Sequence, residues 1–459
     1  LPGLGKDIFL FEGNTKNTVI YVSTNGEHLE KSSNLKYWKE LLNSKDISLE
    51  VITEKNLTID TLKLASNRIT EMTIQTLVSS GKYLREATIN RPELDNLLGD
   101  FAFGKYGAFV LGGESGIGKS TLFAQKSEEW QKNGEVVLFY RASNLINTKI
   151  SDRFFRDLGI RVSYLEDFLV LLNPLFENSE TKFYIVIDAI NEFSGNVSEL
   201  ISEIDGMVQQ AATFNWFRIV VSVRDSSYHQ IPKNVQFGNK SLNRYFTVEE
   251  VVGVGDKVRT PIVKLLPITE NFVEELYNKY RNFKIFDESD SEDPGVYHYR
   301  PLTVFSELNK DENTAKLLRA PLMARLILES YHREILPSDL TFDKVMKLYV
   351  DNVILEKNGL TGGFLQREIL LTTIVKQMDK ENKDILLRDS LFEIPSIKAF
   401  LTNTQKDSPY IQLIDLGVLI EEWDKDNCSI RFAFDKLLEF LMSNLYLPRI
   451  ESIDDVLNL

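Results

Sequence analysis

The sequence predicts an α/β fold built on a parallel sheet, followed by an all-α helical domain and a winged-helix domain. Three observations support this prediction. Strand and helix signals alternate from Arg85 to about Leu266, as expected of a parallel sheet wrapped by helices. A glycine-rich turn separates the first buried strand of that region from the helix that follows it. After Pro267 the pattern changes to successive amphipathic helices, and the last stretch mixes helix and strand.

Residues 1–84 form a small α/β segment and linker helices in this prediction. Strand alternation covers residues 7–11, 18–22 and 47–52, and a short amphipathic helix covers residues 34–42. Helical spacing from Thr58 to about Leu84 is interpreted as a connecting helix pair. Because the sequence begins with Leu1 rather than Met, we expect a piece of a longer protein, with this segment as the tail of an effector domain.

Five apolar runs predict the strands of the parallel sheet, because near-continuous β-branched segments suit strands that are buried on both faces. The runs are Ala108–Leu111, Val136–Tyr140, Phe183–Ile187, Ile219–Val223 and Val263–Leu266. Helical stretches lie between them, at residues 151–158, 164–172 and 197–212. We therefore assign residues 85–267 to one α/β domain.

A turn with the pattern G-x-x-x-x-G-K-S follows the first of these strands. The turn and the start of its helix comprise Gly113, Glu114, Ser115, Gly116, Ile117, Gly118, Lys119, Ser120 and Thr121. The glycines let successive backbone N–H groups point inward around a phosphate, and the helix N-terminus adds partial positive charge. Lys119 would reach the β- and γ-phosphates, and the Ser120 hydroxyl would coordinate Mg²⁺. The strand–loop–helix context predicts a P-loop NTPase domain that binds nucleotide.

Two later strands end in side chains that suit nucleotide chemistry. Asp188 follows the run Phe183–Ile187, at the strand end where open α/β sheets bind ligands, and predicts a carboxylate for the Mg²⁺ shared with Ser120. A helix cap or turn residue is the alternative. Glu192, four residues on, is the candidate general base that positions the attacking water. Arg224 ends the next strand and would read the γ-phosphate, with a surface ion pair as the alternative.

Beyond Pro267, amphipathic helices are predicted at residues 269–282, 314–335, 341–357, 363–379 and 389–402, with the acidic run Asp287–Asp293 as a solvated loop between them. A helix at Tyr410–Ile414, two strands around the turn Asp424–Asn427, and a helix from Asp435 follow. This order is the layout of a winged helix. We assign residues 268–360 to a helical domain and residues 361–459 to a winged-helix domain.

Composition excludes several classes of site. The net charge of −14 disfavours a nucleic-acid surface over the whole chain. Cys428, the single cysteine, excludes an internal disulfide and a cysteine-built zinc site, and it suits a reducing cytosol. The four histidines lack the spacing of metal ligands; they are His28, His229, His298 and His332. No apolar run reaches the ~20 residues of a membrane span and no signal peptide is present, so we expect a cytoplasmic protein with no membrane contact.

Together these motifs resemble the STAND class of P-loop ATPases, the signalling switches that include NACHT and NB-ARC proteins. The resemblance covers roughly residues 85–450, and it rests on Gly113–Ser120, Phe183–Glu192, Val221–Arg224, Leu317–Met323 and the closing residues 416–439. It implies an ATP-binding and ATP-hydrolysing switch whose ADP or ATP state controls self-association into a homo-oligomer and activation of an attached effector. It also implies a role in antiphage defence, a trigger such as a phage protein sensed by a region absent here, and ATP rather than GTP.

The resemblance further implies roles for single residues. Pro321 matches a proline that packs on the adenine, and Arg91 matches the arginine of a pair before the nucleotide domain, with Asn90 in place of the glycine. Asn191 stands where a NACHT-like strand end has a second acid, which leaves Glu192 as the candidate base and suggests slow hydrolysis.

The winged-helix segment departs from the family in a second way. Many relatives have a histidine there that touches the ADP phosphates, and the nearest positions in this chain are Phe434 and Asp435. The resemblance therefore does not extend to an ADP lock through that contact. Phe432 and Phe434 are expected in the core.

Two other classes of function stay open. One is a constitutive AAA-type ATPase that acts on nucleic acid or protein and turns over without a trigger, and the other is a scaffold that holds nucleotide and never hydrolyses it. A winged helix also suggests DNA binding, but the segment Asp435–Leu441 is acidic and apolar rather than basic, which favours packing. Residues 1–55 loosely resemble the end of a nuclease-type effector without its metal-binding carboxylates, so nucleic acid is expected only through a missing effector.

Overall fold

The protein is described by a computed structural model that covers residues 57–446 with short gaps, together with strands at residues 8–9, 17–22 and 47–52. The gaps are residues 146–148, 194, 226–227, 229–230, 232–235, 239–243, 248, 253–256, 287–294, 298–300, 309–311, 332–333, 356–363, 404–407, 417 and 425–426. The four histidines, the acidic run Asp287–Asp293 and the helix predicted at residues 34–42 lie outside the described residues.

The chain divides into two compact units. Unit 1 comprises Leu1–Ile74, Glu93–Gly112 and Phe123–Lys264. Unit 2 comprises Gln75–Pro92, Gly113–Leu122 and Leu265–Leu459. Each unit has its own hydrophobic core among the described residues. The domain boundaries expected from the sequence stay a prediction.

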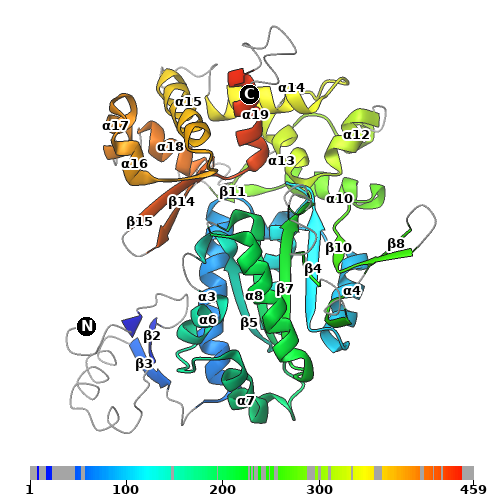
Figure 1. Cartoon of the computed structure of the whole chain (residues 1–459). Helices are drawn as coiled ribbons and strands as arrows, with labels where there is room; N and C mark the ends of the chain where they lie inside the picture. Colours follow the sequence, from blue (N-terminus) through cyan, green and yellow to red (C-terminus); the bar gives the residue numbers. More distant parts are fainter. Residues whose placement is uncertain are drawn as a thin grey trace. The chain divides into compact units, whose positions relative to one another are not determined.

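A five-stranded parallel sheet forms the centre of unit 1, with the strand order β10-β4-β7-β6-β5 (Figure 1). The strands are β4 (Ala108–Gly113), β5 (Val136–Arg141), β6 (Phe183–Asp188), β7 (Phe217–Arg224) and β10 (Ile262–Lys264). Every strand predicted for this sheet is therefore confirmed. Strands β4, β5 and β6 are buried along their whole length, because helices cover both faces of such a sheet.

The helices of this region are α3 (Ile59–Ser79), α4 (Pro92–Phe103), α5 (Lys119–Lys132), α6 (Ile150–Asp157), α7 (Leu165–Phe176) and α8 (Val197–Gln210). Apolar side chains of α3, α6, α7 and α8 share one core with the strands. The predicted helix pair from Thr58 to Leu84 is instead the single helix α3, because no glycine or proline interrupts the segment before Gly81.

Short elements complete unit 1. They are the 3-10 helices η3 (Ala142–Asn144), η4 (Ile190–Glu192) and η5 (Ala211–Thr213), and the antiparallel strands β8 (Glu249–Val252) and β9 (Lys257–Thr260), which were not predicted. The three strands predicted near the N-terminus are confirmed as β1 (Ile8–Phe9), β2 (Asn17–Val22) and β3 (Ile47–Ile52). Strand β2 pairs antiparallel with β1 and parallel with β3.

Unit 2 contains the end of α3 and the 3-10 helix η2 (Arg85–Ala87). Its helices after Leu265 begin with α10 (Glu270–Arg281), α11 (Phe305–Leu308), α12 (Glu312–Leu318), α13 (Pro321–Ser330), α14 (Phe342–Leu348) and the π-helix η7 (Tyr349–Ile354). A two-stranded pair joins them, formed by β11 (Lys284–Phe286) and β12 (Gly295–Tyr297). The single helix predicted at residues 314–335 is wrong. It breaks into α12 and α13, because Pro321 holds Ala320 in an extended conformation and starts a new helix.

The second part of unit 2 contains α15 (Phe364–Glu381), α16 (Arg388–Phe392), α17 (Pro395–Thr402), α18 (Pro409–Asp415) and α19 (Asp435–Tyr446). Its antiparallel sheet has the order β13-β15-β14, from β13 (Ile385–Leu387), β14 (Leu419–Asp424) and β15 (Asn427–Phe432). This is the expected winged-helix layout, with β13 as an addition. The helix predicted at residues 389–402 breaks at Pro395 for the same reason as the helix at Pro321.

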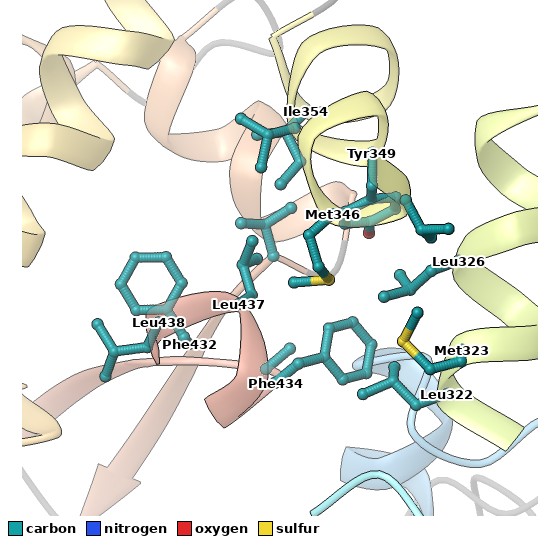
Figure 2. Close-up of a cluster of buried hydrophobic side chains, with 14 of the residues drawn as sticks. Leu322, Met323, Leu326, Met346, Tyr349, Ile354, Phe432, Phe434, Leu437 and Leu438 are labelled. Carbon is teal, nitrogen blue, oxygen red and sulfur yellow. The ribbon is translucent and has the colours of Figure 1, made fainter. Parts of the chain in front are cut away.

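One hydrophobic core runs through both parts of unit 2. Figure 2 shows Leu322 of α13, Met346 of α14 and Leu437 of α19 pointing toward one another, together with Phe434, the residue before α19. Phe434 is 9% exposed and Phe432 is 2% exposed, which confirms the prediction that both belong to the core. The buried Leu437 agrees with a packing role for α19. In the part of the chain that the structure describes, no helix combines the length and apolarity of a bilayer crossing.

Candidate functional site

The glycine-rich turn links the end of β4 to the first residue of α5, as the sequence predicts. Gly116 and Gly118 have φ angles of 78° and 101°, a region that side-chain-bearing residues rarely adopt. A Cβ on Gly116 would also lie 2.8 Å from a terminal carbon of Leu322. Both glycines are therefore required by the backbone of the loop, and Gly116 is required by its surroundings as well. We call residues 113–120 the phosphate loop.

Lys119 folds back onto the phosphate loop. Its ammonium donates to the carbonyl oxygens of Gly113 and Glu114, at 2.7 and 2.8 Å. Ser120 is half-buried in the first turn of α5. Next to it, the Thr121 hydroxyl donates to the carbonyl oxygen of Lys82 at 3.0 Å. The ammonium of the residue predicted to bind phosphate thus contacts two carbonyl oxygens of the loop itself.

Arg91 contacts the phosphate loop. Its guanidinium donates to the carbonyl oxygen of Ile117 at 2.8 Å and to that of Leu266 at 2.9 Å. A Cβ placed on Gly118 would lie 3.5 Å from the Arg91 guanidinium and 3.6 Å from Cγ of Pro321. Arg91 and Pro321, which come from distant parts of the sequence, therefore lie beside the same residue of the loop.

Two more contacts join the loop to the rest of unit 2. The backbone N–H of Leu322, in the first turn of α13, donates to the carbonyl oxygen of Gly116 at 3.3 Å. The Ser115 hydroxyl donates to a carboxylate oxygen of Asp435 at 3.4 Å, and Asp435 is the first residue of α19. Within unit 2, the loop thus has partners in the helical segment and in the winged-helix segment. We refer to Arg91, Leu322 and Asp435 as the loop clamp.

At the ends of β6 and β7 in unit 1, Asp188 is 1% exposed and its carboxylate accepts a 2.5 Å hydrogen bond from the Ser222 hydroxyl. Ser222 in turn accepts a 2.7 Å hydrogen bond from the backbone N–H of Ala189. Ala189 has a left-handed backbone, with φ of 56° and ψ of 58°. One buried hydroxyl therefore orients the Asp188 carboxylate and stabilises the sharp turn after β6.

Glu192 ends the 3-10 helix η4 and forms an ion pair with Arg141, 2.9 Å from a guanidinium nitrogen to Oε2. The Arg141 side chain is 1% exposed and that of Glu192 is 13% exposed. Arg141 ends β5 and pairs in register with Asp188 on the adjacent β6. Because the strands are parallel, the Arg141 guanidinium therefore lies at the same carboxyl ends of the strands as the acidic residues.

Asn191 has a structural function at these strand ends. Its side-chain oxygen accepts a 3.2 Å hydrogen bond from the backbone N–H of Arg224, which links η4 to the end of β7. Arg224 is half-buried there. Beside it, Asp225 lies 3.6 Å from the ammonium of Lys264 at the end of β10. We call Asp188, Glu192, Ser222 and Arg141 the strand-end group.

Two residue sets emerge, one in each unit. Within unit 1 the structure places the predicted Asp188, Glu192 and Arg224 at or just after the carboxyl ends of β6 and β7. Within unit 2 it places Arg91 and Pro321 at the phosphate loop. The roles assigned to these residues stay predictions.

Three residues that sequence reasoning did not select also belong to these sets. Arg141 carries the same signal as Asp188, a charged residue directly after a buried apolar strand, and could have been found. Ser222 and Leu322 give no such signal, because their roles depend on neighbours brought close by folding. Asp435 was considered only as a replacement for a histidine.

Comparisons with known proteins add the following. No family model matches the sequence, and no curated protein matches it. Among solved structures, the chain is similar to Cdc6p from Pyrobaculum aerophilum, at 15% identity over 77% of this chain and 93% of that one, with a TM-score of 0.33. It is similar to the Aeropyrum pernix ORC2 protein at 16% identity over 81% and 96%, with a TM-score of 0.33. A Walker-type ATPase of Pyrococcus abyssi matches at 15% identity over 78% and 97%, with a TM-score of 0.34.

Proposed function

We propose that this chain is a P-loop ATPase that works as a slow nucleotide-controlled switch, in which ADP or ATP at the phosphate loop sets the arrangement of the helical and winged-helix segments. The observation that supports it most is the loop clamp. Three residues from three separate segments of unit 2 bind three successive residues of the loop, Ser115 to Ile117. A ligand that changes the loop therefore acts on all three segments.

The proposed cofactors are ATP or ADP with Mg²⁺. The glycine φ angles and the fold-back of Lys119 fit a loop that receives phosphate, since the amides and the ammonium supply donors for an anion. Ser120 and Asp188 are the proposed Mg²⁺ ligands, because a hydroxyl and a carboxylate are the oxygen ligands that this ion prefers. The ion would neutralise phosphate charge, and Ser222 would keep the Asp188 carboxylate in one orientation.

Glu192 is the proposed general base, and its ion pair fits slow turnover. One carboxylate oxygen of Glu192 is already engaged by the Arg141 guanidinium, 2.9 Å away, and so is not available to a water molecule. Glu192 would then need to leave Arg141 before it can orient and deprotonate water. Arg224 is the proposed reader of the γ-phosphate, and Pro321 and Arg91 are proposed to contact the nucleotide near Gly118.

The test is to denature the purified protein, identify released nucleotide by ion-exchange chromatography, and measure mass by light scattering with ADP, with a non-hydrolysable ATP analogue and without nucleotide. We expect stoichiometric ADP in the resting protein and a larger assembly with the analogue. Lys119→Ala should remove both effects, whereas Lys132→Ala, an exposed lysine on the same helix, should change neither.

The other outcomes separate the alternatives. An empty site with fast turnover would favour a constitutive AAA-type ATPase. Bound nucleotide without turnover or any change in assembly would favour a scaffold. The proposal has two further parts, control of an attached effector and a role in antiphage defence. Both rest on the sequence resemblance alone.

A further inference from the structure

Helix α3 covers the open edge of the sheet in unit 1. Strand β5 is the last strand in the order β10-β4-β7-β6-β5, so among the strands that the structure describes its outer N–H and C=O groups have no partner in that sheet. Such groups are costly when they are buried and unpaired, and a free strand edge can pair with other chains. Apolar residues of α3, including Leu62 and Ala65, belong to the same core as β5.

Two hydroxyls of α3 bind these edge groups. Thr70 donates to the carbonyl oxygen of Val137 at 2.6 Å and accepts from the N–H of Phe139 at 3.1 Å. One hydroxyl thus replaces both the donor and the acceptor of a missing strand. Thr73 lies 2.7 Å from the carbonyl oxygen of Phe139, to which it donates. Thr70 is fully buried and Thr73 is 8% exposed.

Strand β5, which these two threonines bind, also carries Arg141. Phe139 precedes Arg141 by two residues on β5, about 7 Å along an extended strand. Arg141 in turn holds Glu192 at 2.9 Å. A hydrogen bond weakens steeply as its atoms move apart, so a shift of β5 by about 1 Å is enough to break that contact. The hydroxyls of α3 and the carboxylate of Glu192 are therefore joined by one short, rigid piece of sheet.

We propose that α3 is a built-in restraint on catalysis: Thr70 and Thr73 are positioning residues that fix β5, and β5 holds Glu192 through Arg141. Release of α3 lets Arg141 move and frees Glu192 to act as a base. The role of Glu192 rests on the proposed function, but the restraint itself does not. Since α3 follows the small sheet of β1, β2 and β3 along the chain, the restraint gives events in that segment a route to the strand-end group.

The test uses three matched variants of the full chain. The double variant Thr70→Val with Thr73→Val keeps side-chain shape and removes both hydroxyls. The double variant Thr70→Ser with Thr73→Ser keeps both hydroxyls. Thr373→Val is the control, because that exposed hydroxyl donates only to a carbonyl of its own helix, at 2.7 Å among the contacts described. For each, amide hydrogen exchange is followed in peptides covering residues 136–141 and 188–193, and ATP hydrolysis is measured at steady state.

In the valine pair we expect faster exchange in both peptides and a kcat raised about fivefold, the equivalent of one hydrogen bond. KM should change by less than about twofold, because no substrate contact is altered. The serine pair and Thr373→Val should behave as wild type. If the valine pair does not fold, Thr73→Val alone is measured in the same way, since it removes one bond only.

Specific results would overturn the inference. Faster exchange confined to residues 136–141 would show that the hydrogen bonds of Thr70 and Thr73 with β5 are not coupled to η4. An unchanged or lower kcat with faster exchange in both peptides would show that Arg141 does not restrain Glu192. If wild type hydrolyses no ATP, the proposed function fails, while the two exchange peptides still decide whether the restraint exists.

Discussion

Replacing Glu192 by glutamine tests the chemistry and the ion pair together. The change keeps the size of the side chain and removes its charge, so the Arg141 guanidinium then faces an amide. Arg141 is almost fully buried, and the folded state is destabilised when a buried cation loses its anionic partner. Because the glutamine oxygen can still accept one hydrogen bond, we expect a loss of about 1–3 kcal/mol in the free energy of unfolding rather than the full cost of a broken pair.

The same change should abolish hydrolysis. Loss of a general base lowers a rate by about 10²–10⁴-fold, whereas nucleotide binding at the phosphate loop should persist. The assay is urea denaturation followed by circular dichroism, together with nucleotide content and phosphate release. Glu192→Gln should therefore retain ATP and accumulate any ATP-dependent assembly.

A second variant separates stability from chemistry. Adding Arg141→Met to Glu192→Gln removes both charges, so that no buried charge is left without its partner. We expect the double variant to recover unfolding stability to within about 1 kcal/mol of wild type and to remain inactive. Full stability of Glu192→Gln alone would refute the ion pair, and normal phosphate release by either variant would remove Glu192 from the catalytic role.

Three further predictions follow from single contacts. Ser222→Ala should cost about 2–4 kcal/mol of unfolding stability and weaken Mg²⁺-dependent nucleotide binding, because the Asp188 carboxylate and a buried N–H each lose a partner; calorimetric titration with and without Mg²⁺ checks it. The variant Asp435→Asn should bind ATP more tightly than the wild type does, while its asparagine keeps the contact with Ser115. Equal affinities of the variant and the wild type for ATP would contradict this. Burial raises the pKa of Asp205 to about 6, so the folded state loses stability as pH rises from about 4 to 6. Asp205→Asn should therefore be more stable than wild type at pH 7.5, by about 1–2 kcal/mol after allowance for solvent screening, and equally stable near pH 4.

The sheet and the phosphate loop were predictable because their signals are local. Strands β4, β5 and β6 each contain an apolar run of at least four residues, and the loop carries its glycines and Lys119 within a single short stretch. The position of Asp188 followed from the same logic, since it is the first charged residue after a buried strand. What the sequence supplied in these cases was periodicity and adjacency, which need no knowledge of distant neighbours.

The missed features have two different causes. The breaks at Pro321 and Pro395 were readable from the sequence, because proline disfavours helix at the residue before it, and helical spacing was given too much weight. The strand β13 has only three residues, too few to show an alternation. By contrast, the contact of Ser115 with Asp435 joins residues 320 positions apart, and no local pattern encodes such a contact.

The loop clamp also suggests which nucleotide state opens unit 2. In the structure the Lys119 ammonium donates to loop carbonyl oxygens and the Ser115 hydroxyl donates to the Asp435 carboxylate. Phosphate would draw Lys119 inward and bring negative charge toward the Asp435 carboxylate, and two like charges about 5 Å apart repel by about 3 kcal/mol at an effective dielectric constant of 20. A triphosphate adds more charge than a diphosphate, so it should weaken this winged-helix contact more. In the proposed switch, the Asp435 carboxylate would therefore favour release of α19 by ATP over ADP.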